Sequence, residues 1–386
     1  MDIALLAPSP VPLAIGGAEN LWWGLLDHLN RHTPHAADLI KLPTPERNFW
    51  EIVDSYQRWA AVDASGYDLV ISGKYPSWMV AHERHVCYLL HPLRGLYDTY
   101  PHDMPPRCES THPEVKPLVE LLDRPGTDRE LLAECFGRLD ALRARNDVPA
   151  ELFALPGPLI RQVVHFLDTI GRGPGVMCRS GAISATVAGR PGYFPPATAV
   201  TVAHPPTRLV GLHRGRGHYL FTVSRLDRPK RIDLLIEAMR HVKANIELRI
   251  AGTGPQEPEL RGLASRDPRI KLMGFLNEAE LADAYAGARA VLFVPYQEDY
   301  GFITLEAMRS GKPVITTTDA GGPTELISHL VHGLVTAPTP ASLGRAITLL
   351  ARQPWLAWWL GSRGRARAAG ITWDRVVSAL LDGVEV

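Results

Sequence analysis

Short apolar runs alternate along the chain with segments in which apolar residues recur every three or four positions. In the first half, four apolar runs of strand length are bounded by turn-forming or charged residues: 2–7, 37–42, 67–72 and 86–91. After the first run, Leu21, Leu25 and Leu29 recur at helical spacing. Strands that alternate with helices in this way predict a parallel sheet covered by helices on both faces.

A second series of the same kind begins near residue 210. Its apolar runs are 218–223, 246–251, 270–274, 290–294 and 313–317, and helical spacing follows most of them. The repetition predicts a second doubly wound domain. Between the two series, residues 101–175 contain many prolines and little strand signal, with helical spacing over 113–123 and 129–146. We interpret this segment as a helical insertion.

Composition and charge narrow the classes of partner. The chain has 386 residues with 41 basic and 41 acidic side chains, so it lacks the basic excess of a nucleic-acid-binding protein. The zero net charge conceals an asymmetry, because residues 1–200 carry −5 and residues 201–386 carry +5. No apolar stretch approaches the about 18 residues of a transmembrane segment. The four cysteines contain no CxxC pair that would suggest a zinc site. We expect a cytoplasmic protein and leave peripheral membrane attachment open.

A glycine pair, Gly16-Gly17, lies between the first predicted strand and its helix. Glycines at this place let backbone amides approach a phosphate group. A plain tight turn, with Glu19 beside the helix start, explains the pattern equally well. The loop lacks the G-x-G-x-x-G pattern of dinucleotide-binding proteins, which disfavours a dehydrogenase.

Two loops of the second series carry charged residues where ligands bind in open α/β folds, after the strands. In SRLDRPKR, Arg225 and Lys230 could hold two phosphates, although a solvated basic turn is the ordinary explanation. In EDYGFITLE, Glu298 lies in a loop and Glu306 lies inside the following helix. Residues 301–304 should form the first turn of that helix, with free amide groups. The glycines of DAGGPTELI fit a phosphate loop or a turn, and both readings stay open.

Four patterns together, SRLDRPKR, AGTGP, EDYGFITLE and DAGGPTELI, resemble in order and spacing the donor domain of family-4 retaining glycosyltransferases (glycosyltransferase group 1). In the first half, GGAE and CYLLHPLRGLYD resemble that family's glycine loop and its YCHxPxR segment. The resemblance implies the GT-B fold, in which two doubly wound Rossmann-like domains face each other across a cleft. The expected domains are an N-terminal, acceptor-side domain over 1–208, a nucleotide-sugar donor domain over 209–365, and a helix over 366–386 that crosses back.

The resemblance also implies roles for individual residues. Arg225 and Lys230 would hold the donor diphosphate, Glu298 would bind hydroxyls of the donor sugar, and His91 would face that sugar from the first domain. Glu306 would bind the nucleotide ribose. The other expected donor-binding residues are Gly16, Gly17, Gly252, Gly254, Gly301, Phe302, Ile303 and Thr304.

These roles predict a metal-independent hexosyltransferase with no cofactor. Its donor would be a UDP- or GDP-sugar, and its acceptor a glycan, a lipid-linked molecule or a small molecule. A nucleotide-sugar epimerase of the same fold and an inactive nucleotide-sugar-binding subunit remain alternatives. Trp355, Trp358 and Trp359 are expected to pack at the domain junction and not to bind sugar.

Overall fold

The structure, a computed structural model, describes residues 1–11 and 16–384 of the chain. Contacts between residues divide these into two compact units. The first unit contains the described residues of 1–183, 187–203 and 374–384, and the second contains 184–186 and 204–373.

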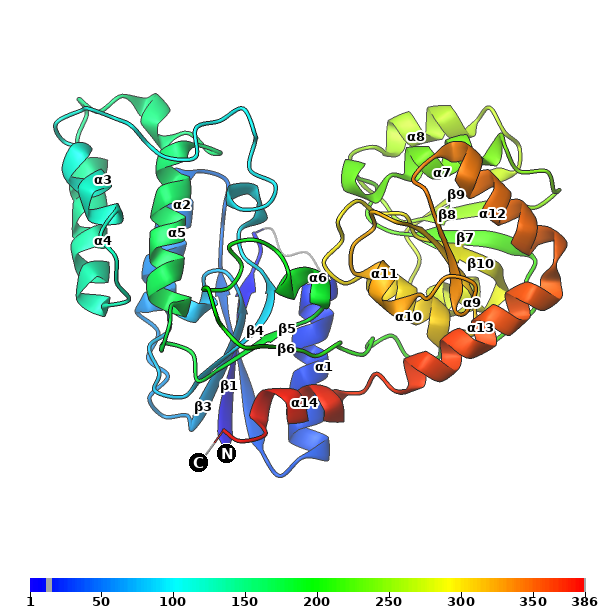
Figure 1. The fold of residues 1–386 in the computed structure, drawn as a ribbon, viewed down its shortest axis with the longest axis horizontal. Coiled ribbons are helices and arrows are strands. Elements are labelled where there is room, and N and C mark those ends of the chain that lie inside the picture. The colour runs from blue at the N-terminus through cyan, green and yellow to red at the C-terminus, as the bar shows by residue number, and fades with distance from the viewer. Residues whose placement is uncertain (12–15, 385–386) are drawn as a thin grey trace. The chain divides into compact units, whose positions relative to one another are not determined.

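The first unit is built on a parallel sheet of six described strands in the order β2-β1-β3-β4-β5-β6 (Figure 1). The strands are β1 (Asp2–Ser9), β2 (Ala36–Pro43), β3 (Leu69–Lys74), β4 (His85–His91), β5 (Arg179–Ala182) and β6 (Val200–Val202). The apolar residues of β1 from Ile3 to Ala7 are fully buried, as a central strand between two helical layers requires. The four strands predicted in this half are confirmed, whereas β5 and β6 carry too few apolar residues to be recognised.

Helices surround this sheet. They are α1 (Gly17–His32), α2 (Phe49–Ala60), α3 (Lys116–Leu122), α4 (Arg129–Arg143), α5 (Pro158–Arg172) and most of α14 (Trp373–Leu381), with short α6 (Ala185–Ala188) at the unit boundary. Within the predicted helical insertion, α3 and α4 pack beside α5 (Figure 1). The face of α5 toward the sheet buries Asp168, which accepts hydrogen bonds from Tyr56 Oη at 2.6 Å and Trp78 Nε1 at 2.8 Å. Residues of α14 from Asp374 onward join the first unit, where Arg179 donates to the Ala379 carbonyl at 3.0 Å.

The second unit has a parallel sheet of six described strands in the order β12-β11-β10-β7-β8-β9. They are β7 (Tyr219–Val223), β8 (Leu248–Ala251), β9 (Ile270–Gly274), β10 (Ala288–Leu292), β11 (Val314–Thr317) and β12 (Gly333–Thr336). The chain starts at the centre in β7, builds outward to β9, and returns to β10 on the other side of β7. This order confirms the predicted doubly wound fold, and the strand order reverses between β7 and β10, where folds of this kind bind ligands beyond the carboxyl ends of the strands.

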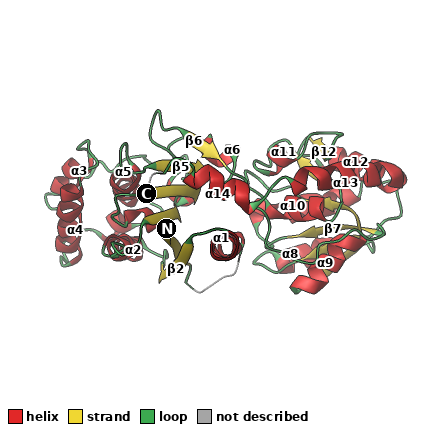
Figure 2. Cartoon of the chain, turned by 90° about the horizontal axis from the view of Figure 1, so that it is seen from below, coloured by secondary structure: helices red, strands yellow, loops and turns green. Residues whose placement is uncertain are grey.

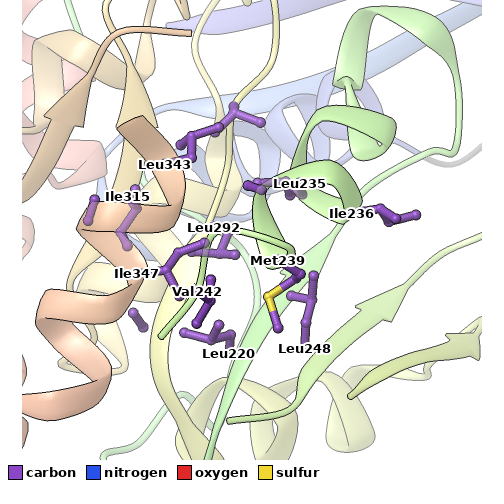
Figure 3. Close-up of a cluster of buried hydrophobic side chains, with 14 of the residues drawn as sticks. Leu220, Leu235, Ile236, Met239, Val242, Leu248, Leu292, Ile315, Leu343 and Ile347 are labelled. Atoms are coloured by element: carbon purple, nitrogen blue, oxygen red, sulfur yellow. The ribbon is translucent and has the colours of Figure 1, made fainter. Parts of the chain in front are cut away.

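Helices flank this sheet (Figure 2), and the side chains of its strands alternate between two helical layers. Leu220, Leu292 and Ile315 pack on one face against α7 and α12 (Figure 3). Phe221 and Val314 pack on the other face, with α9 and α10. The helices of this unit are α7 (Ile232–Met239), α8 (Glu257–Ala264), α9 (Glu278–Gly287), α10 (Phe302–Arg309), α11 (Pro323–Leu326), α12 (Pro340–Arg352) and α13 (Pro354–Ala369). The two apolar layers fix the strand register, and with it the positions of the loops that leave the strands.

Candidate active site

Loops at the carboxyl ends of the second sheet bring several of the expected residues to one edge. The 224–231 loop follows β7, Gly252 follows β8, the 293–301 loop follows β10, and the 318–322 loop follows β11. Parallel strands end at the same edge of a sheet, so four separate sequence motifs meet there.

Lys230 and Glu298 form the charged centre of this edge. Lys230 ends the short 3₁₀ helix Arg228–Lys230, and its Nζ lies 2.5 Å from Glu298 Oε2. Their side chains are 20% and 24% exposed, so the pair is partly shielded from water and still accessible to a ligand. The two residues are 68 positions apart in the chain, and both are expected at the donor site from the sequence.

Arg225 has different surroundings. Its side chain is 70% exposed, and its Nε lies 3.7 Å from Asp227 Oδ2. An exposed guanidinium that makes only a long contact keeps its donors available for an anion. Arg225 therefore lies in the same loop as Lys230 but outside the ion pair that Lys230 forms with Glu298.

Arg231 is a residue that the sequence analysis missed. It has a left-handed conformation, with φ of 51°, directly before α7. Its guanidinium donates to the carbonyls of Val294 and Pro295 at 2.7 Å and to the Asp319 carboxylate at 2.8 Å. These hydrogen bonds hold the pKa of Asp319 below its usual value. Arg231 therefore ties the loops after β7, β10 and β11 together, and no sequence signal separates it from the other cations of SRLDRPKR.

The glycine pairs of this edge are required by backbone packing. Gly321 has φ of 77°, and a Cβ there would lie 2.5 Å from the Glu298 carbonyl oxygen. Gly252 has φ of 111°, and a Cβ would overlap the Ser224 carbonyl. Gly254 and Gly322 likewise face the backbones of Leu226 and Tyr300. Close contact between loops accounts for these glycines, so they need no phosphate to explain them.

The helix α10 begins as expected, at Phe302 after Gly301. Gly301 has φ of 87°, which a residue with a side chain rarely adopts. The amide of Thr304 donates back to the Gly301 carbonyl at 2.9 Å. The earlier amides of the first turn, at Phe302 and Ile303, are groups that a helix cannot satisfy internally. The Thr304 side chain is fully buried. The polar groups that this turn can offer a ligand are therefore those of its backbone.

Glu306 lies one turn further along α10. Its Oε2 accepts from Tyr285 Oη at 2.7 Å, and its Oε1 accepts from Thr207 Oγ1 at 3.0 Å. Burial raises the pKa of this carboxyl group, while the two hydroxyl hydrogen bonds oppose the rise. Each oxygen keeps a further lone pair, so Glu306 can still accept from a ligand hydroxyl. The sequence did not identify either hydroxyl partner.

The expected residues of the first unit lie at two places. Gly16 precedes α1 in an extended conformation, and no atom lies within 4 Å of where its Cβ would be. Gly17 opens the helix, and the preceding residues 12–15 lie outside the described residues. His91 ends β4, where its Nδ1 lies 2.8 Å from the Pro92 carbonyl oxygen. Burial, together with the charge of Lys74, lowers the pKa of His91 to about 3. The ring is therefore neutral at neutral pH.

The lowered pKa of His91 predicts a pH-dependent stability. As the pH falls from the ordinary histidine value of 6.5 toward 3, the unfolded chain gains a proton at this residue that the folded chain does not. The folded state therefore loses stability over this range. In urea titrations across it, His91→Gln should lose less stability on acidification than the parent, because glutamine does not titrate. Parallel stability curves for the two proteins would contradict the assignment.

Among the described residues, no group of three or more His, Cys, Asp or Glu side chains is arranged to hold a metal ion. A search of the described helices found none with the length and apolar content needed to cross a membrane.

Part of the second unit matches a known protein family, and several known proteins are similar to the chain in sequence. Residues 217–353 match the family model described as "Glycosyl transferases group 1". Human alpha-1,3/1,6-mannosyltransferase ALG2 is 27% identical over 173 residues, covering 40% of this chain and 41% of that protein. A D-inositol 3-phosphate glycosyltransferase of Streptomyces bingchenggensis is 29% identical over 193 residues, covering 46% and 40%. The chain thus spans about two fifths of the length of these relatives.

Solved structures match over nearly the whole chain. A sucrose-phosphate synthase from Thermosynechococcus elongatus has a TM-score of 0.64 at 17% identity, covering 99% of this chain and 97% of that one. HepE of Anabaena, solved in complex with UDP-glucose, has a TM-score of 0.62 at 16% identity, covering 100% and 99%. At these identities the likeness shows the fold. The chain therefore has the GT-B fold of glycosyltransferases, and its residues 217–353 match the glycosyl transferases group 1 family.

Proposed function

We propose that the protein is a retaining glycosyltransferase that moves a hexose from a nucleotide-diphospho-sugar to an acceptor hydroxyl. The observation that carries this proposal is the Lys230–Glu298 pair at 2.5 Å, beside the start of α10. A cation and open helix amides can bind a diphosphate there, and a carboxylate next to them can accept hydrogen bonds from a sugar.

Glycosyl transfer requires groups that stabilise negative charge, and this edge of the sheet supplies them. When the bond between sugar and phosphate breaks, negative charge grows on the diphosphate while the sugar becomes electron-poor. Lys230, Arg225 and the amides of the first turn of α10 would stabilise that charge, and such groups act most strongly when they are held in place beforehand. Glu298 would orient the sugar through its hydroxyls, and Glu306 would bind the ribose.

Retention would follow without a protein nucleophile. We propose that the acceptor approaches on the face from which the diphosphate leaves, and that a phosphate oxygen takes the acceptor proton. Glu298 is committed to Lys230 at 2.5 Å, which reduces its nucleophilicity and suits a binding role. The cations would take the place of a metal ion at the diphosphate, so no cofactor is expected. The roles predicted for Gly16, Gly17 and His91 stay predictions.

Donor and acceptor are proposed as classes. The relatives named for mannosyl and inositol phosphate glycosyl transfer, and the fold neighbour bound to UDP-glucose, support a UDP- or GDP-hexose as donor. The acceptor would be a hydroxyl of a glycan, a lipid-linked molecule or a small molecule.

A donor panel tests the proposal. The purified protein is incubated with UDP-, GDP- and dTDP-hexoses, with and without EDTA, and release of free nucleoside diphosphate is measured. We expect nucleoside diphosphate to be released from donors of one nucleotide class only. Both transfer and slow hydrolysis of the donor release this leaving group, so either reaction is detected. We expect the release to persist in EDTA. Loss in EDTA with recovery on adding Mn²⁺ would refute metal independence. Accumulation of an epimer of the donor sugar, with no diphosphate released, would refute transfer.

A further inference from the structure

A second polar site lies at the opposite edge of the second sheet, at the amino ends of β7, β10 and β11. Arg214, Arg216, Arg289 and Lys312 line a pocket of about 620 Å³, and we call these four residues and the cavity the basic pocket. Among the described residues, none of the four makes an ion pair with a carboxylate, and the pocket lining contains no acidic side chain. The pocket therefore concentrates positive charge without a counter-ion.

The buried member of the basic pocket is Lys312, whose residue surface is only 4% exposed. Its Nζ donates to the carbonyl oxygen of Gly215 at 2.9 Å. Burial, with the charges of Arg214 and Arg289, lowers its pKa to about 8. Arg214 also donates to neutral acceptors, the Gly311 carbonyl at 3.1 Å and Ser362 Oγ at 2.8 Å. An uncompensated cation in such a place is costly unless an anion joins it.

The helix α13 borders the basic pocket and exposes tryptophans. Trp355, Trp358 and Trp359 are 67%, 61% and 41% exposed, so the packing expected for them from the sequence is wrong. Arg214 stacks on Trp358, with its guanidinium carbon 4.9 Å from the ring centroid. We call the three tryptophans the tryptophan face. It is continuous with the basic pocket, because Trp358 lines the pocket itself.

The helix α13 buries mostly small residues and exposes its three tryptophans. It packs beside α10 (Figure 1) through small residues, and a Cβ on Gly361 would overlap the Gly311 carbonyl. Ala357, Leu360, Gly364 and Ala368 are buried as well, while the three tryptophans are exposed. At 100° per residue, the three tryptophans lie within one third of the helix circumference, between Arg363 on one side and Arg365 on the other.

We propose that the tryptophan face and the basic pocket dock the protein on a bilayer that contains anionic phospholipids. Tryptophan favours the boundary between headgroups and acyl chains, where its ring is apolar and its N–H stays hydrated. The flanking arginines match the negative surface of such a leaflet, and the basic pocket receives a headgroup phosphate. Exposed aromatic and cationic side chains on one helix are the combination that interfacial helices use.

The position of the pocket separates it from the proposed donor site. The donor diphosphate is assigned to loops at the carboxyl ends of the strands, whereas the basic pocket lies at their amino ends. Exposed tryptophans beside these cations favour a lipid surface over a soluble phosphate compound. The inference does not depend on the proposed function, because it concerns a different edge of the sheet.

Vesicle binding tests the inference. The full chain is sedimented with vesicles of phosphatidylcholine, with and without phosphatidylglycerol, while tryptophan fluorescence is recorded. We expect binding and a blue shift only with phosphatidylglycerol, weakened by salt. Replacing all three tryptophans by alanine should abolish the blue shift and binding. Arg216→Gln with Lys312→Met should weaken binding by roughly tenfold or more, and Arg216→Gln with Arg365→Gln gives the same test if the buried change prevents folding.

The control removes the same charge elsewhere in the unit. Arg261→Gln with Arg266→Gln, both at exposed positions on or just after α8, should bind the anionic vesicles as the parent does. Equal loss in this control would overturn the assignment of the basic pocket. So would thermal stabilisation by inorganic phosphate without vesicle binding, which indicates a soluble ligand, or dimerisation through the tryptophan face in sedimentation velocity.

Discussion

Lys230→Ala should reduce glycosyl transfer by at least about 100-fold, the usual loss when one preorganised donor to a developing negative charge is removed. The change takes away the ammonium group 2.5 Å from Glu298 and leaves that carboxylate without its partner. The cation is lost where the diphosphate would leave, and the remaining carboxylate repels it. The effect should fall mainly on turnover, because the interaction strengthens as charge develops. Initial rates with the donor found in the panel measure it.

The controls separate charge at this place from charge in general. Lys271→Ala removes an exposed lysine on β9 and should leave the rate unchanged. Lys230→Arg keeps the cation but changes its shape, so we expect a rate between those of the parent and Lys230→Ala. A near-normal rate in a folded Lys230→Ala protein would refute the site assignment and, with it, the proposed function.

Gly252→Ala should destabilise the second unit by about 2–4 kcal/mol, as expected when an overlap is added to a left-handed backbone. The residue has φ of 111°, and its Cβ would overlap the Ser224 carbonyl. The loop after β8 cannot move away freely, because Leu226 donates its amide to the Thr253 carbonyl at 2.9 Å and accepts from Gln256 at 3.0 Å. Urea unfolding followed by far-UV circular dichroism measures the loss.

A second glycine provides the matched control. Gly262 lies inside α8, where a Cβ would meet no atom within 4 Å. Gly262→Ala should keep or raise the stability by roughly 0.5–1 kcal/mol, the helix preference of alanine over glycine. If Gly252→Ala were as stable as Gly262→Ala, the close loop packing at this edge would be wrong.

The fold could be predicted because most strands of both sheets are short apolar runs. Residues such as Leu220, Leu292 and Ile315 are fully buried, and burial on both faces is what a continuous apolar run indicates. The edge strand β6 was missed because it lacks this signal: Thr201 and Val202 are exposed. Short edge strands depend on a neighbour that only the folded chain supplies.

The candidate site could be predicted in part. Lys230 and Glu298 were assigned together from the motif resemblance, and the structure brings them into contact. The supporting residues of this edge could not be found, because Arg231 contacts Asp319 and Tyr285 contacts Glu306, each more than 20 positions away. The tryptophans of α13 were misjudged, since large apolar residues usually pack inward, whereas here Leu360 and several glycines and alanines are buried instead.

The network around Arg231 has a consequence for binding energetics. Its guanidinium joins the segments after three strands, and the Pro229 carbonyl accepts the Tyr296 amide at 2.8 Å while the Glu298 amide donates to Ala320 at 2.9 Å. These segments are cross-linked before any ligand arrives, so they behave as one rigid platform. A ligand that binds there spends little conformational entropy on ordering them, and more of its contact energy remains as affinity.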